Sequence, residues 1–154
     1  KIFNISDANI KNSMKKMRLK GRLEEIKSGK LKNLIGENRL IIDGGHNINS
    51  AISISNWVKQ QNEKVHLICG MMNDKPHKEF VNQFENSVNS ITLIDIPNQE
   101  GSISKEEFKK KLGNKNINTA ESIEESLLMN NKDKNCIFLC AGSLYLAGEV
   151  LNLN

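Results

Sequence analysis

The chain has few of the features that mark membrane, secreted or nucleic-acid-binding proteins. Aromatic residues make up 5% of its 154 residues, so there is little surface on which bases could stack. No segment approaches the ~20 apolar residues of a membrane span, and no sustained apolar run follows the opening residues 1–4 as it would in a signal peptide. We therefore expect neither a membrane nor a nucleic acid as partner.

Cysteine is also scarce, and its pattern excludes the usual disulfide and zinc frameworks. The three cysteines, Cys69, Cys136 and Cys140, are odd in number and show no CxxC spacing. They lie in or beside apolar runs, where a free cysteine acts as a small buried hydrophobe. This usage favours a reducing, cytoplasmic compartment.

Complete nucleotide-binding loops are missing from the sequence. There is no GxxxxGK[ST] segment, and Gly44-Gly45-His46 does not continue into GxGxxG. If the chain contacts ATP, we expect it to supply side contacts while another domain holds the phosphates.

Positive charge is modest overall but concentrated near the start. The net charge is +4, and six Lys or Arg residues fall between Lys11 and Arg22. A solvated helix face explains this stretch best, because no aromatic residue is interleaved there. An RNA-binding alternative would require salt-sensitive retention on nucleic acid through residues 15–22.

Apolar runs of strand length alternate with helical patterns along most of the chain. This order predicts an α/β fold with a mostly parallel, Rossmann-like sheet and helices on both faces, three layers in all. We expect one domain over residues 1–154, with an entry segment at 1–36 and the main sheet at 37–154. The entry segment should hold a helix from Ser6 to Met17 and extended pieces at Arg22–Ile26 and Leu31–Leu34. The expected strands are 40–42, 65–69, 91–94, 118–120 and 136–140, and the expected helices are 49–61, 76–84, 104–112, 122–129 and one from 144.

Polar or small residues follow three of the predicted strands. They are Asp43 to Asn47 (DGGHN), Gly70 to Lys75 (GMMNDK) and Ala141 to Ser143. Each loop alone could be a turn with a helix cap. Because the carboxyl ends of parallel strands share one edge of a sheet, we expect the three loops to converge on one crevice.

These segments resemble those of a known family. DGGHN is similar to the DGAHN motif of folylpolyglutamate synthases and bifunctional dihydrofolate synthases, members of the Mur ligase superfamily. Gly21-Arg22 resembles the GR pair before that motif, residues 70–75 the family's GMxxDK, and residues 142–150 its GSLYLxGEV ending. Gly45 stands where the family usually has alanine. The match covers about residues 6–151 and corresponds only to the family's C-terminal domain.

The resemblance implies an ATP-dependent acid–amino-acid ligase of folate biosynthesis and polyglutamylation. Such enzymes phosphorylate a carboxylate of dihydropteroate or a folate, and glutamate's amine then displaces phosphate to form an amide. By this resemblance Arg22 contacts the ATP phosphates and Asp43 the nucleotide, through its ribose, while His46 and Ser143 lie in the glutamate pocket. A guanidinium suits phosphate oxygens, a carboxylate accepts from ribose hydroxyls, and an imidazole can orient a carboxylate or act as a base.

Further residues complete the expected site. Asn47, Asp74 and Lys75 would support it, although Asp74 and Lys75 could simply pair with each other. The chain's own N-terminal ATPase domain would be its partner and would hold most of the ATP and Mg²⁺. We expect no metal ligands and no catalytic residue in this piece, which should be inactive alone. His66 and His77 lack metal-ligand companions and are expected to be structural.

Simpler explanations remain open for each residue. Arg22 could be a surface cation, and Asp43 or Ser143 could do no more than cap a helix. At the level of function, the alternative is a stand-alone α/β module that binds a small anionic ligand at the same crevice without catalysis. A parent reading frame that begins near Lys1, with no GxxxxGK[ST] segment before it, would favour that alternative.

Overall fold

The fold is built on one six-stranded sheet. The computed structural model describes residue 9, residues 20–113 and residues 116–154. Along the sheet the strands follow the order β1-β2-β6-β3-β4-β5. Strand β1 pairs antiparallel with β2, and the other neighbouring pairs are parallel. The strands are β1 Glu24–Ile26, β2 Arg39–Asp43, β3 Lys64–Cys69, β4 Ser90–Leu93, β5 Asn118–Thr119 and β6 Cys136–Ala141.

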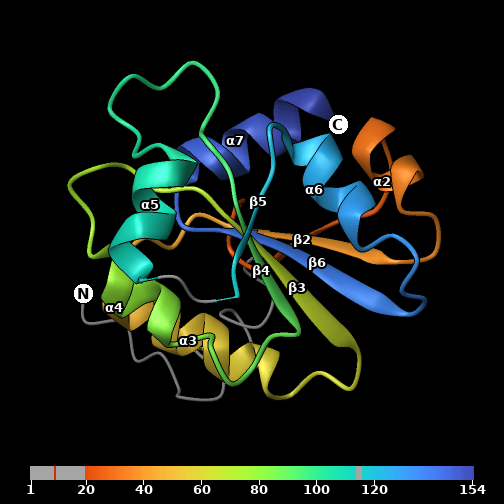
Figure 1. Ribbon diagram of the computed structural model, residues 1–154. Coiled ribbons are helices and arrows are strands. Elements are labelled where there is room, and N and C mark those ends of the chain that lie inside the picture. The colour runs from red at the N-terminus through yellow and green to blue at the C-terminus, as the bar shows by residue number, and fades with distance from the viewer. Residues whose placement is uncertain (1–8, 10–19, 114–115) are drawn as a thin grey trace, which may run out of the picture.

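Helices cover both faces of this sheet and form the outer two of three layers (Figure 1). One face carries α3 (Ile48–Val58), α4 (His77–Asn82) and α5 (Lys105–Leu112). The other carries α2 (Lys30–Leu34), α6 (Ile123–Met129) and α7 (Leu144–Leu153). Within the described ranges, none of these helices is long and apolar enough to cross a membrane. The predicted parallel α/β architecture is confirmed.

The central strands and the starts of the longer helices follow directly from the sequence. All six residues of β6 are buried, as expected for a strand that lies between two others with helices on both faces. Helices α3, α5, α6 and α7 each begin after a side chain that accepts a hydrogen bond from a backbone N–H of the first turn. Those caps are Asn47, Ser104, Ser122 and Ser143.

One predicted element is wrong, and others lie outside the described residues. Leu31–Leu34, expected to be extended, belongs to helix α2. The C-terminal residue stabilises this short helix, because Lys30 N–H donates to Asn154 O (3.0 Å) and Lys32 N–H to Asn154 Oδ1 (3.1 Å). The Ser6 to Met17 helix and residues 11–19 of the basic stretch are not described. The division at residue 36 stays a prediction.

The three cysteines are free and buried, as the sequence indicated. Burial raises the pKa of the Cys140 thiol to about 12 and that of Cys136 to about 11. Burial also raises the pKa of the Cys69 thiol. Because the thiolate is the reactive form, these thiols contribute to packing rather than chemistry.

Candidate functional site: three loops at one sheet edge

The loops after β2, β3 and β6 meet at one edge of the sheet. Asp43 and Cys69, the last residues of β2 and β3, are both in register with Ala141, the last residue of β6. The next residue, Gly142, lies so close to the β3 loop that an added Cβ would sit 2.8 Å from Gly70 O. The three loops therefore lie at one edge of the sheet, as predicted, although only the loop after β2 lines the pocket described below.

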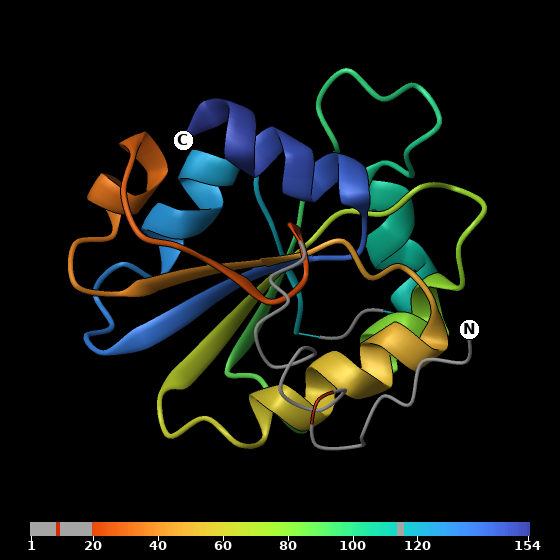
Figure 2. The same ribbon diagram turned by 180° about the vertical axis from the view of Figure 1, so that it is seen from behind.

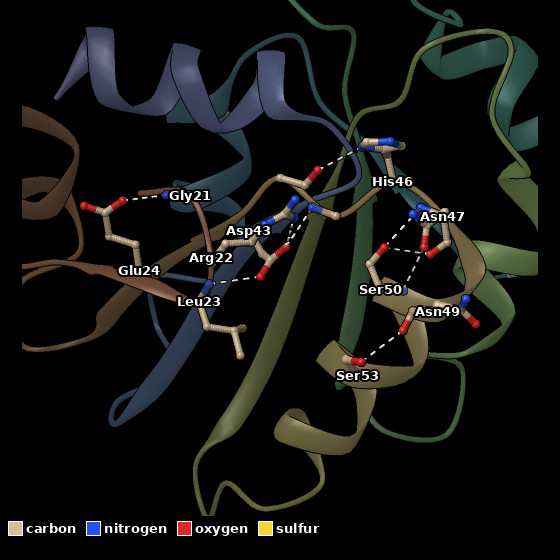
Figure 3. Close-up of polar contacts among 12 residues, drawn as sticks. Gly21, Arg22, Leu23, Glu24, Asp43, His46, Asn47, Asn49, Ser50 and Ser53 are labelled. Atoms are coloured by element: carbon tan, nitrogen blue, oxygen red, sulfur yellow. Dashed lines mark hydrogen bonds and ion pairs between the residues drawn. The ribbon is translucent and has the colours of Figure 1, made fainter. Parts of the chain in front are cut away.

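The side chain of Asp43, at the end of β2, is largely engaged by the chain itself (Figure 3). Its Oδ2 accepts a hydrogen bond from Leu23 N–H at 2.9 Å, and its Oδ1 accepts one from Gly45 N–H at 2.7 Å. The Arg22 guanidinium lies 3.4 Å from Oδ1. Only 7% of the Asp43 side chain is exposed. Its carboxylate therefore has well-defined partners in the absence of any ligand.

Arg22 is presented on an unusual backbone turn that runs beside the end of β2 (Figure 2). Its neighbours Gly21 (φ +65°) and Leu23 (φ +41°) both have left-handed backbone angles. Two hydrogen bonds fix Gly21, since its carbonyl accepts from Gly44 N–H (2.8 Å) and its N–H donates to Glu24 Oε2 (2.7 Å). The Arg22 side chain itself is 46% exposed. The turn is thus held firmly while the guanidinium reaches solvent.

His46 and Asn47 form the entrance to helix α3. His46 Nδ1 lies 3.1 Å from Gly44 O. Because a carbonyl can only accept, Nδ1 carries the proton, and Nε2 of the neutral ring is left as an acceptor. Asn47 Oδ1 accepts from Ser50 N–H (2.9 Å), and Ser50 Oγ accepts from Asn47 N–H (3.1 Å). This reciprocal capping box orients the positive end of the α3 dipole toward the site.

A pocket of about 250 Å³ lies between the Arg22 turn and the start of α3. A guanidinium, an imidazole, an amide, two hydroxyls and the Asp43 carboxylate line it, and of these the Arg22 guanidinium is the group suited to an anion. A larger hollow of about 480 Å³ is lined mainly by α5 and receives none of the three loops. The residues that line the smaller pocket are Arg22, Leu23, Asp43, Gly45, His46, Asn47, Ser50, Ser53 and Ile54.

The other predicted site residues lie around this pocket rather than in its lining. Ser143 is buried, and its Oγ caps α7 by accepting from Tyr145 N–H at 3.1 Å. Asp74 and Lys75 pair with each other at 2.7 Å. The pKa of Asp74 is lowered chiefly by the hydrogen bond from Lys75, and the charge of His46 acts in the same direction. The Asp74–Lys75 pair therefore agrees with the simpler explanation that these two residues bind each other.

Metal ligands do not gather among the residues that the structure describes, where no three His, Cys, Asp or Glu side chains could hold an ion together. His66 Nδ1 lies 2.8 Å from Ser90 Oγ, and His77 Nε2 lies 3.0 Å from Met72 O. Desolvation by burial lowers the pKa of both histidines. Their contacts agree with structural roles.

Sequence reasoning missed four residues of the pocket, namely Leu23, Ser50, Ser53 and Ile54. Ser50 could have been found, because Asn47 followed three residues later by a hydroxyl residue is close to the capping-box pattern. Ser53 lies one turn further along the helix from Asn49, whose carbonyl accepts from its hydroxyl at 3.0 Å. Leu23 has no sequence signal, because its role depends on a bond to Asp43, twenty positions away.

A family match now connects this geometry to known proteins. The family described as Mur ligase, glutamate ligase domain matches residues 21–144. The chain belongs to this family. The match contains both the Arg22 turn and the loops after β2, β3 and β6. No curated protein sequence matches the chain significantly.

Solved folylpolyglutamate synthases contain the same fold as this glutamate ligase domain. A Mycobacterium tuberculosis folylpolyglutamate synthase, complexed with ADP and AMPPCP, superposes with a TM-score of 0.78 at 15% sequence identity, and the superposition covers 97% of the chain. For a Yersinia pestis bifunctional folylpolyglutamate synthase/dihydrofolate synthase, complexed with AMPPNP and Mn, the TM-score is 0.76, the identity 18% and the coverage 97%. For a bifunctional folylpolyglutamate synthase/dihydrofolate synthase with Mn, AMPPNP and L-glutamate bound, the TM-score is 0.72, the identity 18% and the coverage 97%. The chain spans 35% of each of these structures.

Proposed function

We propose that this glutamate ligase domain forms one wall of the active cleft of an ATP-dependent ligase that joins glutamate to the carboxylate of dihydropteroate or a folate. The carboxylate is activated as an acyl phosphate, and glutamate's amine attacks it to release phosphate. The observation that carries the proposal is the pocket between Arg22 and the start of α3, at the edge where three family motifs meet. Nucleotide and glutamate in related synthases support this substrate class.

Arg22 and Asp43 form the nucleotide side of the proposed site. Arg22 is the exposed cation of the pocket, and its contact with Asp43 is long, so its fork of donors can turn to a phosphate oxygen. Asp43 has lone pairs beyond those used by the two backbone N–H groups, and a ribose hydroxyl could donate to them. Affinity for ATP by this domain alone should be weak, because one helix terminus adds only ~0.3–1 kcal/mol for an anion.

The glutamate side of the proposed site is formed by His46, with Ser143, Asn47 and the Asp74–Lys75 loop in support. His46 Nε2 is left as an acceptor, so it can receive a proton from an incoming ammonium group. Ser143 would support the site indirectly, because its Oγ caps the start of α7. Mg²⁺ and most of the ATP would be held by an N-terminal ATPase domain, which is consistent with the chain spanning only 35% of related synthases.

The test is glutamate ligation by the complete ligase that carries this domain. Arg22→Ala, Asp43→Ala and His46→Ala should each lose ligation while the enzyme keeps its fold, and Lys78→Ala on α4 is a matched exposed control. Normal ligation by all three site variants would sink the assignment. The isolated domain should show no ATP turnover.

A further inference from the structure

The Asp43 carboxylate is arranged as a clamp on the polypeptide rather than as an open ligand group. Its two oxygens accept from backbone N–H groups of two separate segments, Leu23 at 2.9 Å and Gly45 at 2.7 Å. The side chain is 7% exposed. A carboxylate so buried needs donors of this kind to offset its lost hydration.

The segment held by this clamp is one that leucine would not adopt unaided. Leu23 has φ +41°, a left-handed angle that is uncommon for a residue with a bulky side chain. In this conformation its N–H donates to Asp43 Oδ2. Gly21 on the other side of Arg22 also has a positive φ, and its carbonyl is bonded to Gly44 N–H. Both flanks of Arg22 are therefore attached to the end of β2.

We infer that Asp43 is a positioning residue for Arg22, which fixes the left-handed turn so that the guanidinium is presented to a phosphate group at the α3 pocket. The inference rests on the proposed function of this pocket and goes beyond a ribose contact. The same carboxylate oxygen that binds Gly45 N–H lies 3.4 Å from Arg22, so it links the turn, the DGGHN loop and the guanidinium.

Three roles of Asp43 make different predictions for Asp43→Asn. An asparagine has one acceptor oxygen, so it can hold Leu23 or Gly45 but not both, and its NH₂ group would oppose the other N–H. If Asp43 positions Arg22, the variant binds inorganic pyrophosphate more weakly. If Asp43 acts only as a charge, removal of a negative group strengthens the binding of an anion. If Asp43 contacts only ribose, ADP binding falls and pyrophosphate binding does not.

The experiment is a titration of the complete ligase that carries this domain with pyrophosphate and with ADP, followed by isothermal titration calorimetry. We expect Asp43→Asn to lower the affinity for both ligands about tenfold, which corresponds to the loss of roughly one charge-assisted hydrogen bond. Arg22→Ala should weaken pyrophosphate similarly, and the double variant should be no weaker than Arg22→Ala. Glu25→Gln, which removes a carboxylate of β1 that pairs with Arg39 and not with Arg22, is the charge control and should leave the affinity within about twofold.

Each outcome decides the inference. Unchanged or tighter pyrophosphate binding by Asp43→Asn would overturn it, and so would an additive double variant. If the unaltered ligase binds neither ligand, the proposed nucleotide site fails, and this outcome is distinct from binding that Asp43→Asn leaves unchanged. If Asp43→Asn does not fold, hydrogen exchange of the Leu23 amide in the unaltered chain is the readout. Strong protection is expected there, and an unprotected amide would contradict the clamp.

Discussion

Replacement of Gly142 by alanine should destabilise the domain strongly. Gly142 begins the loop after β6 and has φ +114°, a backbone conformation that residues with a Cβ rarely adopt. An added Cβ would lie 2.8 Å from Gly70 O, 2.9 Å from Cys69 Sγ and 2.9 Å from Met71 Cγ. One of these contacts is with backbone, which cannot move aside cheaply.

The expected cost of Gly142→Ala has two parts. The backbone conformation contributes about 1–3 kcal/mol, and insertion of a methyl group into a packed site contributes about 1–3 kcal/mol more. The free energy of unfolding should therefore fall by about 2–6 kcal/mol, a large part of the ~5–15 kcal/mol that a natural domain possesses.

Alanine variants of two other glycines, compared by urea unfolding, distinguish the backbone cost from the packing cost. Gly36 has φ +58° and no atom within 4 Å of an added Cβ, so Gly36→Ala should cost only about 1–2 kcal/mol. Gly148 lies inside α7 with open space around it, so Gly148→Ala should stabilise by about 0.5–1 kcal/mol. If Gly142→Ala costs no more than Gly36→Ala, the three loops do not pack as closely as described.

Three further predictions concern individual side chains. Burial lowers the pKa of His66 from 6.5, so the unfolded chain takes up a proton before the folded one, and the free energy of unfolding should fall as pH drops below about 6.5. Measured by urea unfolding, the free energy of unfolding should depend less on pH in His66→Gln, and an unchanged pH dependence would contradict the assignment. Asn38→Ala should lower the free energy of unfolding by about 2–4 kcal/mol, because Cys136 N–H (3.0 Å) and Asp133 O (2.9 Å) lose their hydrogen-bond partner. A loss below about 1 kcal/mol in urea denaturation would refute this. Gly45→Ala would place a Cβ 2.7 Å from Ser50 Cβ and should lower the free energy of unfolding by about 1–3 kcal/mol. Ser50→Gly in the same chain should restore part of this stability, and no recovery would show that the contact with Ser50 is not responsible.

The parallel sheet and the polar loops at one of its edges were predictable, because both depend on local patterns. Apolar runs, broken only by His66 in β3, identified β2, β3 and β6, and polar residues directly after them indicated the candidate edge. Long-range contacts explain what sequence reasoning missed. Helix α2 depends on hydrogen bonds to Asn154, and the conformation of Leu23 depends on Asp43. Neither interaction can be predicted from the residues that are adjacent in the sequence.

The most direct measurement is a crystal structure of the complete ligase that carries this domain, with ADP bound. The account predicts a phosphate oxygen of ADP within hydrogen-bond distance of the Arg22 guanidinium, with Leu23 still held by Asp43 and the start of α3 lining the same pocket. ADP bound with its phosphates away from Arg22 and from the edge formed by β2, β3 and β6 would contradict it.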